Sequence, residues 1–213
     1  EEDNEENTGS IFDTTYAPIV TEVTAAPTVN SAYAGASPVV IDPIDKPTPT
    51  PLPAISFSFQ TYSATKLHLS FDAPVGWTVD DTSTDTYILT QPDYEAIPGY
   101  QASITVHTAS VNSQYNSSDL AKEVKQMLET IGSGGFSSFS ESRTAERTLL
   151  SKAGVYANYT AVTSDGVEVA GRVHVTCIDK VLYSVHVTYP LGYRDTYVDQ
   201  VYGQLRKTIT ITK

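Results

Sequence analysis

Apolar and polar residues alternate with a period of two in much of the chain after residue 54. Successive side chains of a β-strand point to opposite faces, so this alternation is typical of half-buried antiparallel strands. The turn sequences Ser164-Asp165-Gly166 and Asp179-Lys180 join the longest of these segments into hairpins. The pattern predicts strands at residues 55–60, 67–71, 87–89, 102–107, 155–163, 167–178, 181–189 and 208–212.

Two segments change to the helical period of three to four residues. The first covers residues 118–131, where Ser117 or Ser118 can cap the start and Gly132 suits a left-handed exit. The second begins at about Asp195. Their apolar stripes are Leu120, Val124, Met127, Leu128 and Ile131 in the first helix, and Val198, Val201, Tyr202 and Leu205 in the second. The element order predicts an α+β domain, an antiparallel β-sheet with two packed α-helices.

Residues 1–54 have a different composition. They hold eight of the twelve prolines, and nine acidic residues against the single base Lys46. Alternating Pro and Thr favour polyproline II, which extends about 3 Å per residue without internal hydrogen bonds. We predict an extended, acidic, Pro/Thr-rich stalk or linker at 1–54 and a single α+β domain at 55–213. Ile19–Val23 and Val39–Ile41 leave two interpretations open, a loose linker or short strands that add to a sheet edge.

The net charge of −12 argues against two classes of partner. Nucleic acids need Lys and Arg to displace their counterions, and anionic lipid surfaces attract basic segments, so neither is expected. No apolar run approaches the roughly 20 residues of a membrane-spanning helix. The chain begins at Glu1 without an apolar leader, and we interpret it as a processed or truncated form whose targeting segment has been removed.

Three features together resemble the PsbP/Mog1 fold. They are the strand that ends in Phe71-Asp72-Ala73-Pro74-Val75-Gly76-Trp77, the amphipathic helix at 118–131, and the hairpins of Tyr156–Tyr189 followed by a helix. The resemblance covers about residues 55–213 and implies a scaffold that mostly binds other proteins. Relatives of this fold include a photosystem subunit, a small-GTPase regulator and bacterial surface lipoproteins.

The acidic stalk makes the chain most similar to the lipoproteins. That resemblance implies a bacterial, extracytoplasmic protein associated with the cell envelope. The lipid-bearing cysteine would lie upstream of Glu1, and contact with the membrane is expected only through this anchor. No functional residues are carried over, because these relatives share a fold rather than a site.

His174 and His186 are the candidates for a metal site. They lie on the neighbouring strands 167–178 and 181–189, and both rings point away from the valine-rich face if the turn between the strands preserves parity. Zinc needs three or four ligands, and the pattern offers no obvious third. The alternative is that both are ordinary residues of a polar sheet face. We expect the alternative, and so no metal or other cofactor.

Tyrosine is abundant, and twelve of the 14 tyrosines follow residue 54. A ring that carries a hydroxyl suits surfaces that contact protein or carbohydrate, although tyrosine is also common in strands that have no such role. The segments around residues 94–100 and 193–197 have loop character, which makes burial less expected. They predict an aromatic binding face of Tyr94, Tyr100, Tyr193 and Tyr197.

No complete catalytic set is present in the sequence. Cys177 alternates with valines and is expected in the core rather than as a nucleophile. Residues 80–85 lack the Gly and Glu of a calcium loop and indicate a solvated turn. No Gly-x-Ser-x-Gly elbow is found. We expect a non-catalytic binding or scaffold domain with a protein or glycan partner. The alternatives are a small-ligand or metal carrier and a divergent hydrolase.

Overall fold

The computed structural model describes residues 51–93 and 100–212. The helices are α1 (Ser117–Gly132), the 3₁₀ turns η2 (Thr65–Leu67) and η3 (Leu191–Tyr193), and three consecutive segments that we call the C-terminal helix: α2 (Arg194–Thr196), η4 (Tyr197–Tyr202) and α3 (Gly203–Thr208). The strands are β1 (Phe59–Ala64), β2 (Leu69–Pro74), β3 (Thr78–Asp80), β4 (Thr86–Thr90), β5 (Ser103–Ser110), β6 (Ser138–Glu141), β7 (Ala145–Glu146), β8 (Gly154–Val162), β9 (Glu168–Ile178), β10 (Val181–Pro190) and β11 (Thr210–Ile211).

The strands form two antiparallel sheets. The large sheet has the order β3-β4-β5-β10-β9-β8-β6, with β7 also paired to β8. The small sheet has the order β1-β2-β11, so the last strand of the chain pairs with one of the first. The predicted α+β class, with an antiparallel β-sheet and two packed helices, is confirmed. The division into two sheets was not predicted.

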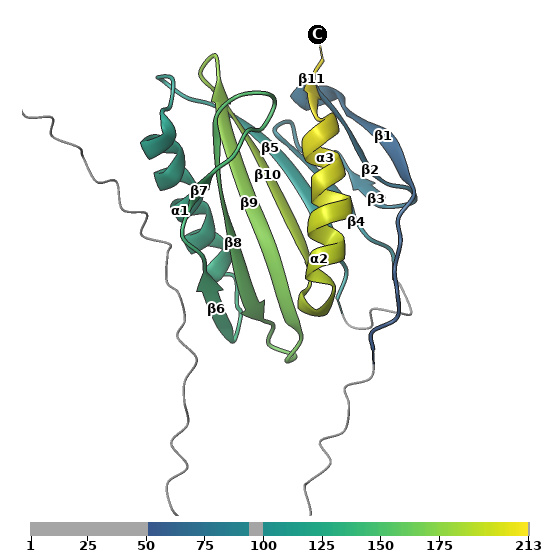
Figure 1. Ribbon diagram of the computed structural model, residues 1–213. Helices are drawn as coiled ribbons and strands as arrows, with labels where there is room; N and C mark the ends of the chain where they lie inside the picture. The colour runs from purple at the N-terminus through teal and green to yellow at the C-terminus, as the bar shows by residue number, and fades with distance from the viewer. Residues whose placement is uncertain (1–50, 94–99, 213) are drawn as a thin grey trace, which may run out of the picture. The chain divides into compact units, whose positions relative to one another are not determined.

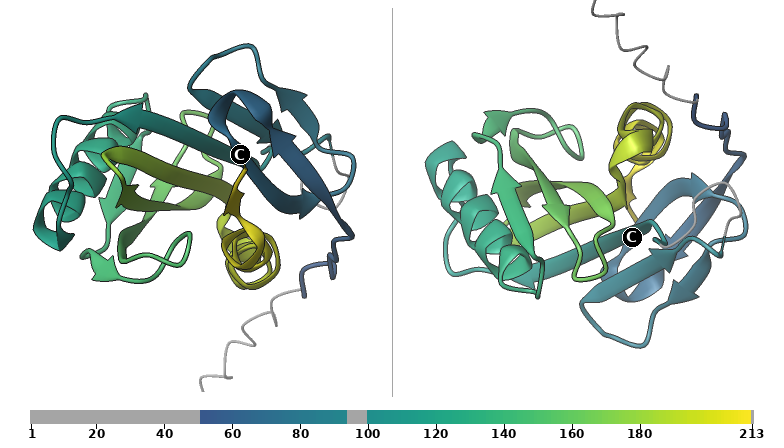
Figure 2. Two further views of the ribbon diagram at one scale, coloured as in Figure 1. Left: turned by 90° about the horizontal axis from the view of Figure 1, so that it is seen from above. Right: turned by 90° about the horizontal axis from the view of Figure 1, so that it is seen from below.

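The large sheet carries a helix on each face (Figure 1, Figure 2). α1 packs on one face, mainly over β8 and β9. The C-terminal helix lies on the other face, beside the small sheet, and α3 packs against β2. Each face therefore has its own hydrophobic cluster, and the sheet separates the two.

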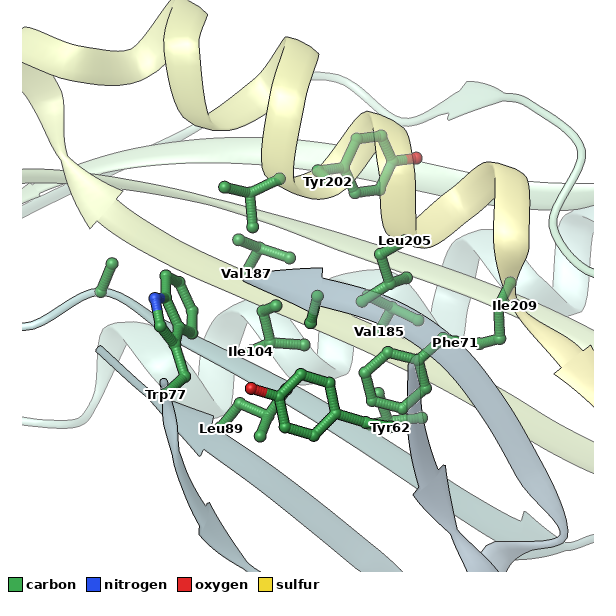
Figure 3. Close-up of a cluster of buried hydrophobic side chains, with 14 of the residues drawn as sticks. Tyr62, Phe71, Trp77, Leu89, Ile104, Val185, Val187, Tyr202, Leu205 and Ile209 are labelled. Atoms are coloured by element: carbon green, nitrogen blue, oxygen red, sulfur yellow. The ribbon is translucent and has the colours of Figure 1, made fainter. Parts of the chain in front are cut away.

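The cluster under the C-terminal helix interlocks three elements (Figure 3). The small sheet contributes Tyr62 and Phe71, whose ring centroids are 6.4 Å apart. The large sheet contributes Val185, and the end of the helix contributes Leu205 and Ile209. Burial of apolar area is the main favourable term in folding, at about 25 cal/mol per Å², so this contact fixes the small sheet against the large one.

α1 begins one residue earlier than predicted, and its cap differs. The side chain of Asn116 accepts hydrogen bonds from the backbone N–H groups of Ser118 and Asp119, at 2.8 and 3.1 Å. The Asp119 carboxylate in turn accepts from the Asn116 N–H, which completes a capping box. The predicted caps Ser117 and Ser118 are therefore wrong. The side-chain oxygen of Asn116 lies just before the helix and reaches two N–H groups that have no partner within the helix. Ser117 and Ser118 already belong to the helix and do not cap these groups.

The C-terminal helix is wider in its middle than an α-helix, because Tyr197–Tyr202 is π-helical. The side chains of Tyr197, Val201, Tyr202 and Leu205 are buried, and Val198 only partly. The predicted apolar side is thus confirmed for three of its four members. The π turn adds Tyr197, which packs parallel to Tyr189 with ring centroids 5.5 Å apart.

β9 is buried on both faces, whereas the alternation predicted one polar, solvent-facing side. Arg172, His174 and Thr176, assigned to that side, are only 6%, 0% and 0% exposed. Tyr202 of the C-terminal helix packs on Arg172 and bonds His174. Hydrogen bonds within the protein satisfy Nε of Arg172, Nε2 of His174 and the hydroxyl of Thr176. Alternation shows which residues share a face, but it does not show what covers that face.

The first strand also differs from its prediction. β1 begins at Phe59, and the preceding Ile55 and Phe57 pack into the core without belonging to a strand. The predicted stalk, up to residue 50, lies outside the described residues, as does the extended character assigned to it. Within the described ranges, no helix has the length and apolarity needed to cross a membrane.

Candidate functional site

His174 and His186 point to opposite faces of the large sheet. Val185 lies opposite His174 in the β9–β10 pair, and Val173 lies opposite His186. Directly opposed residues of an antiparallel pair share a face, so the two rings cannot bind one ion. The turn does not preserve parity, and the expectation of a shared face is wrong. Among the described residues, no group of three His, Cys, Asp or Glu could hold a metal.

His174 lies under the C-terminal helix. Its Nε2 is 3.0 Å from the carbonyl oxygen of Arg147, and its Nδ1 is 2.7 Å from the hydroxyl of Tyr202. A carbonyl only accepts, so Nε2 carries the proton and Nδ1 accepts from Tyr202. Burial, aided by the charges of nearby arginines, lowers the pKa of His174 to about 4. The ring is therefore neutral at pH 7.

His186 lies on the side of α1. Its Nε2 is 2.9 Å from the hydroxyl of Tyr159, a buried residue of β8. Burial lowers the pKa of His186 to about 4 and raises the pKa of Tyr159, so the pair is uncharged at neutral pH.

A groove of 380 Å³ lies beside this pair, between α1 and the strands β4, β5 and β10. It exists because α1 packs mainly over β8 and β9 and leaves the neighbouring part of the same sheet face uncovered. The sheet supplies a polar floor, and one side of α1 supplies a mixed wall. The floor residues are Thr86, Thr105, His107, Ser184 and His186; the wall residues are Glu123, Gln126, Met127, Thr130 and Ile131.

Part of the lining of this groove could be predicted from the sequence. The polar positions of residues 102–107 were predicted to share one face, and Thr105 and His107 do lie together on the floor. The lateral position of α1 was the missing information, because helical periodicity defines which side of the helix is apolar but not which strands it covers.

His107 has neighbours that resemble parts of a hydrolase site. Its Nδ1 is 3.0 Å from the Thr86 hydroxyl and 3.8 Å from a carboxylate oxygen of Asp85. A catalytic base needs its nucleophile on one ring nitrogen and its orienting acid on the other, whereas here both lie at the same nitrogen. In the described ranges, no histidine bonds a serine through one nitrogen and a carboxylate through the other.

Two of the four tyrosines of the predicted aromatic face are buried. Tyr193 is 8% exposed and Tyr197 is 0% exposed, and the Tyr197 hydroxyl donates to Gln91 at 2.5 Å. The loop character assigned to these two was wrong, because both belong to helical turns that pack on the sheet. Tyr100 is half-buried and donates to Thr188 at 2.9 Å. Tyr94 lies outside the described residues.

Two other candidates behave as expected. Cys177 is 5% exposed and belongs to the cluster under α1, which confirms its placement in the core. In the turn after β3, Asp80 accepts two hydrogen bonds from Thr82, and Asp85 accepts from Ser83 and Thr86. These carboxylates close a solvated turn and do not converge on a common point.

The fold that these elements build is PsbP/Mog1-like. Cyanobacterial PsbP (CyanoP) from Synechocystis sp. PCC 6803 has a similar structure, with a TM-score of 0.55 and 19% identity over 76% of this chain and 99% of that one. The Ran-binding protein Mog1p from Saccharomyces cerevisiae aligns with a TM-score of 0.52 and 10% identity over 74% and 97% of the two chains. At these identities the similarity defines the fold alone. No protein-family model and no curated protein sequence matches the chain.

Proposed function

We propose that the domain is a non-catalytic binding module, and that its groove between α1 and the strands β4, β5 and β10 holds an extended, uncharged segment of a protein partner. The groove itself is the observation that carries this proposal. Its volume of 380 Å³ lies in the range of ligand-binding clefts, and it leaves a polar sheet face without cover.

The dimensions of the groove suit a short extended peptide. Its wall residues recur along α1 from Glu123 to Ile131, which spans about 12 Å at 1.5 Å per residue. A chain in the β conformation rises about 3.3 Å per residue, so roughly four residues fit along this length. Hydroxyl and imidazole groups on the floor can bond peptide N–H and C=O groups, while Met127 and Ile131 can contact apolar side chains.

The lining favours an uncharged protein segment over a glycan or an ion. Glu123 is the single carboxylate among the lining residues, and neither Lys nor Arg is present to balance an acidic ligand. The lining also lacks Trp, Tyr and Phe, the rings on which sugars usually stack. The same fold is used by a Ran-binding protein, which is consistent with a role in protein binding.

We also propose that the domain works outside the cytoplasm of a bacterium, at the cell envelope, on a stalk of residues 1–54 with a lipid anchor upstream of Glu1. The support is the acidic, Pro/Thr-rich composition of that segment. The native protein is expected to partition into the detergent phase of a detergent extraction. Recovery in the aqueous phase would contradict the anchor.

The groove can be tested with a residue-specific probe. Met127 is the only methionine of the chain and lines the groove, so a methyl-labelled sample reports on this site with one signal. Peptides selected from a random display library against residues 51–213 are expected to be uncharged and to shift the Met127 methyl resonance.

A blocking variant supplies the control. Thr105→Arg fills the floor of the groove with a long charged side chain and should weaken the binding of the selected peptides at least tenfold. Thr160→Arg makes the same change at an exposed position on the other face of the sheet and should leave their affinity unchanged. Peptides that bind both variants equally, or that leave Met127 unshifted, would refute the proposal, as would a library that yields no binder.

A further inference from the structure

Arg172 is a buried cation for which residues 51–93 and 100–212 supply no acidic partner. Its side chain is held between the rings of Tyr156 and Tyr202, with the guanidinium carbon 4.9 and 4.6 Å from their centroids. Nε donates to the side-chain oxygen of Asn158 at 2.7 Å. The residue is only 6% exposed, and Nη1 has no hydrogen-bond partner.

Arg206 presents a second unpaired donor near the same place. It follows Tyr202 by four residues on the C-terminal helix, so the two side chains lie on one side of the helix. Its Nη1 makes a long hydrogen bond of 3.4 Å to the carbonyl oxygen of Thr148, and its buried Nε has no partner. The adjacent Arg147 is joined to this cluster through His174, whose Nε2 donates to its carbonyl oxygen.

The cluster is positive although the protein is acidic. Within the described ranges the ion pairs are His107–Asp85 and Lys122–Asp119, and neither includes an arginine. The charges of Arg206, Arg147 and Arg172 all act on His174, whose pKa is lowered first by burial and then further by them. The neutral ring adds no charge, and no carboxylate of the described residues lies at ion-pair distance from the three guanidinium groups to offset their repulsion.

We propose that Arg147, Arg172 and Arg206 bind a tetrahedral oxyanion, a phosphate group that is either free or part of a monoester. Two buried N–H donors without partners are unusual in a folded protein, and an ion that accepts from both removes that penalty. Donors that come from three side chains on different elements suit a tetrahedral anion better than a planar carboxylate, which a single guanidinium can bind through two parallel hydrogen bonds.

The structure also indicates how an anion would enter. Arg147 is exposed and Arg206 is half-buried, so these two form the outer part of the cluster and Arg172 the inner part. The Arg206 side chain is held by one long hydrogen bond, so little opposes its movement toward an entering anion. This site lies on the face of the large sheet that is opposite the groove, and it is independent of the function proposed for the groove.

The test is a titration with inorganic phosphate at constant ionic strength, balanced with chloride and followed by thermal melting and calorimetry. The wild-type domain should melt at a higher temperature as phosphate increases. Arg206→Gln and Arg147→Gln should each bind phosphate at least tenfold more weakly, because each removes a charged donor. Both residues reach the surface, so these variants test the site without removing the buried Arg172.

Lys125→Gln is the matched control, because it removes one positive charge from an exposed position of α1 on the opposite face. It should leave phosphate binding unchanged. Equal losses of phosphate affinity in all three variants would show that only the net charge matters and would overturn the proposal. A wild-type melting temperature that does not respond to phosphate would also overturn it. Phenyl phosphate identifies the source: tighter binding than inorganic phosphate indicates a monoester ligand, and weaker binding indicates the free anion.

Discussion

At Gly171, strand β9 has no side chain because the ring of Tyr159 occupies the space. A Cβ atom built there would overlap the Cε1, Cζ and hydroxyl atoms of that ring. The ring cannot move freely, since it stacks on Phe139 with centroids 5.0 Å apart and bonds His186. This glycine is therefore a packing requirement and not a turn residue.

Gly171→Ala should lower the free energy of unfolding by about 1–3 kcal/mol, the usual range for overpacking in a core. Denaturant unfolding measures this directly. In a Tyr159→Ala background, where the ring is absent, the same substitution should cost less than about 0.5 kcal/mol, because only the backbone preference of glycine remains. Equal costs in the two backgrounds would show that the contact does not matter.

For single residues, the sequence predicted which face of a strand a side chain lies on better than it predicted what packs against that side chain. The burial of Cys177 followed from its alternation with valines. The burial of Tyr193 and Tyr197 did not follow, because it depends on a helix that returns to the sheet from a distant part of the chain. The partners of His174 were hidden for the same reason, since Arg147 and Tyr202 are remote from it in sequence and join it only in the fold.

Among the elements, α1 was the most predictable, because a long apolar stripe is a strong signal of a helix. Its start was not, since Asn116, Ser117 and Ser118 are all good capping residues and the choice depends on where the chain first turns. The sequence pattern did not predict the π-helical segment Tyr197–Tyr202. It did not predict the width of the groove either, because that width depends on how α1 packs against the sheet.

Asn116→Ala should destabilise the domain by about 1 kcal/mol, because two N–H groups at the start of α1 lose their acceptor. Chemical denaturation followed by circular dichroism is suitable. Asn116→Asp should retain most of the stability, since aspartate caps equally well. Ser117→Ala is the comparison. If it lowered the free energy of unfolding as much as Asn116→Ala, the assignment of Asn116 as the cap would be wrong.

For the whole molecule, the class of fold was predictable and the layering was not. The order of strands, helix, strands, helix and strand was predicted, but the short strands β3, β6 and β7 were not. The small sheet also joins the two ends of the domain, because β11 pairs with β2 of the β1–β2 hairpin. Long-range pairing of this kind has no local signal. The small sheet and the C-terminal helix cover one face of the large sheet, α1 covers part of the other, and each face carries a neutral histidine.

Both histidines make stability depend on pH. Their pKa is about 4 in the folded protein and about 6.5 in an unfolded chain, so unfolding takes up protons between these values. The contribution of the two histidines to stability is complete above pH 6.5 and falls as the pH decreases toward 4, by on the order of 3 kcal/mol for each ring. Urea unfolding from pH 7.5 to 4.5 should show this loss.

Carboxylates also titrate in this range, so variants must isolate the two imidazoles. His174→Gln and His186→Gln should each reduce the slope of stability against pH between 6.5 and 4.5. A slope that both variants share with the wild-type protein would mean that the buried rings are not responsible.

Asp179 and Lys180 form an exposed two-residue turn, with positive φ angles of 51° and 62°. Exposed loop tips usually tolerate insertions. Here one added residue would exchange the inner and outer sides of β10, moving Val185 and Val187 to the α1 side and His186 to the other. Substitutions at these two turn positions should therefore be tolerated more readily than insertions, because the length of the turn determines which residues of β10 are buried on each face.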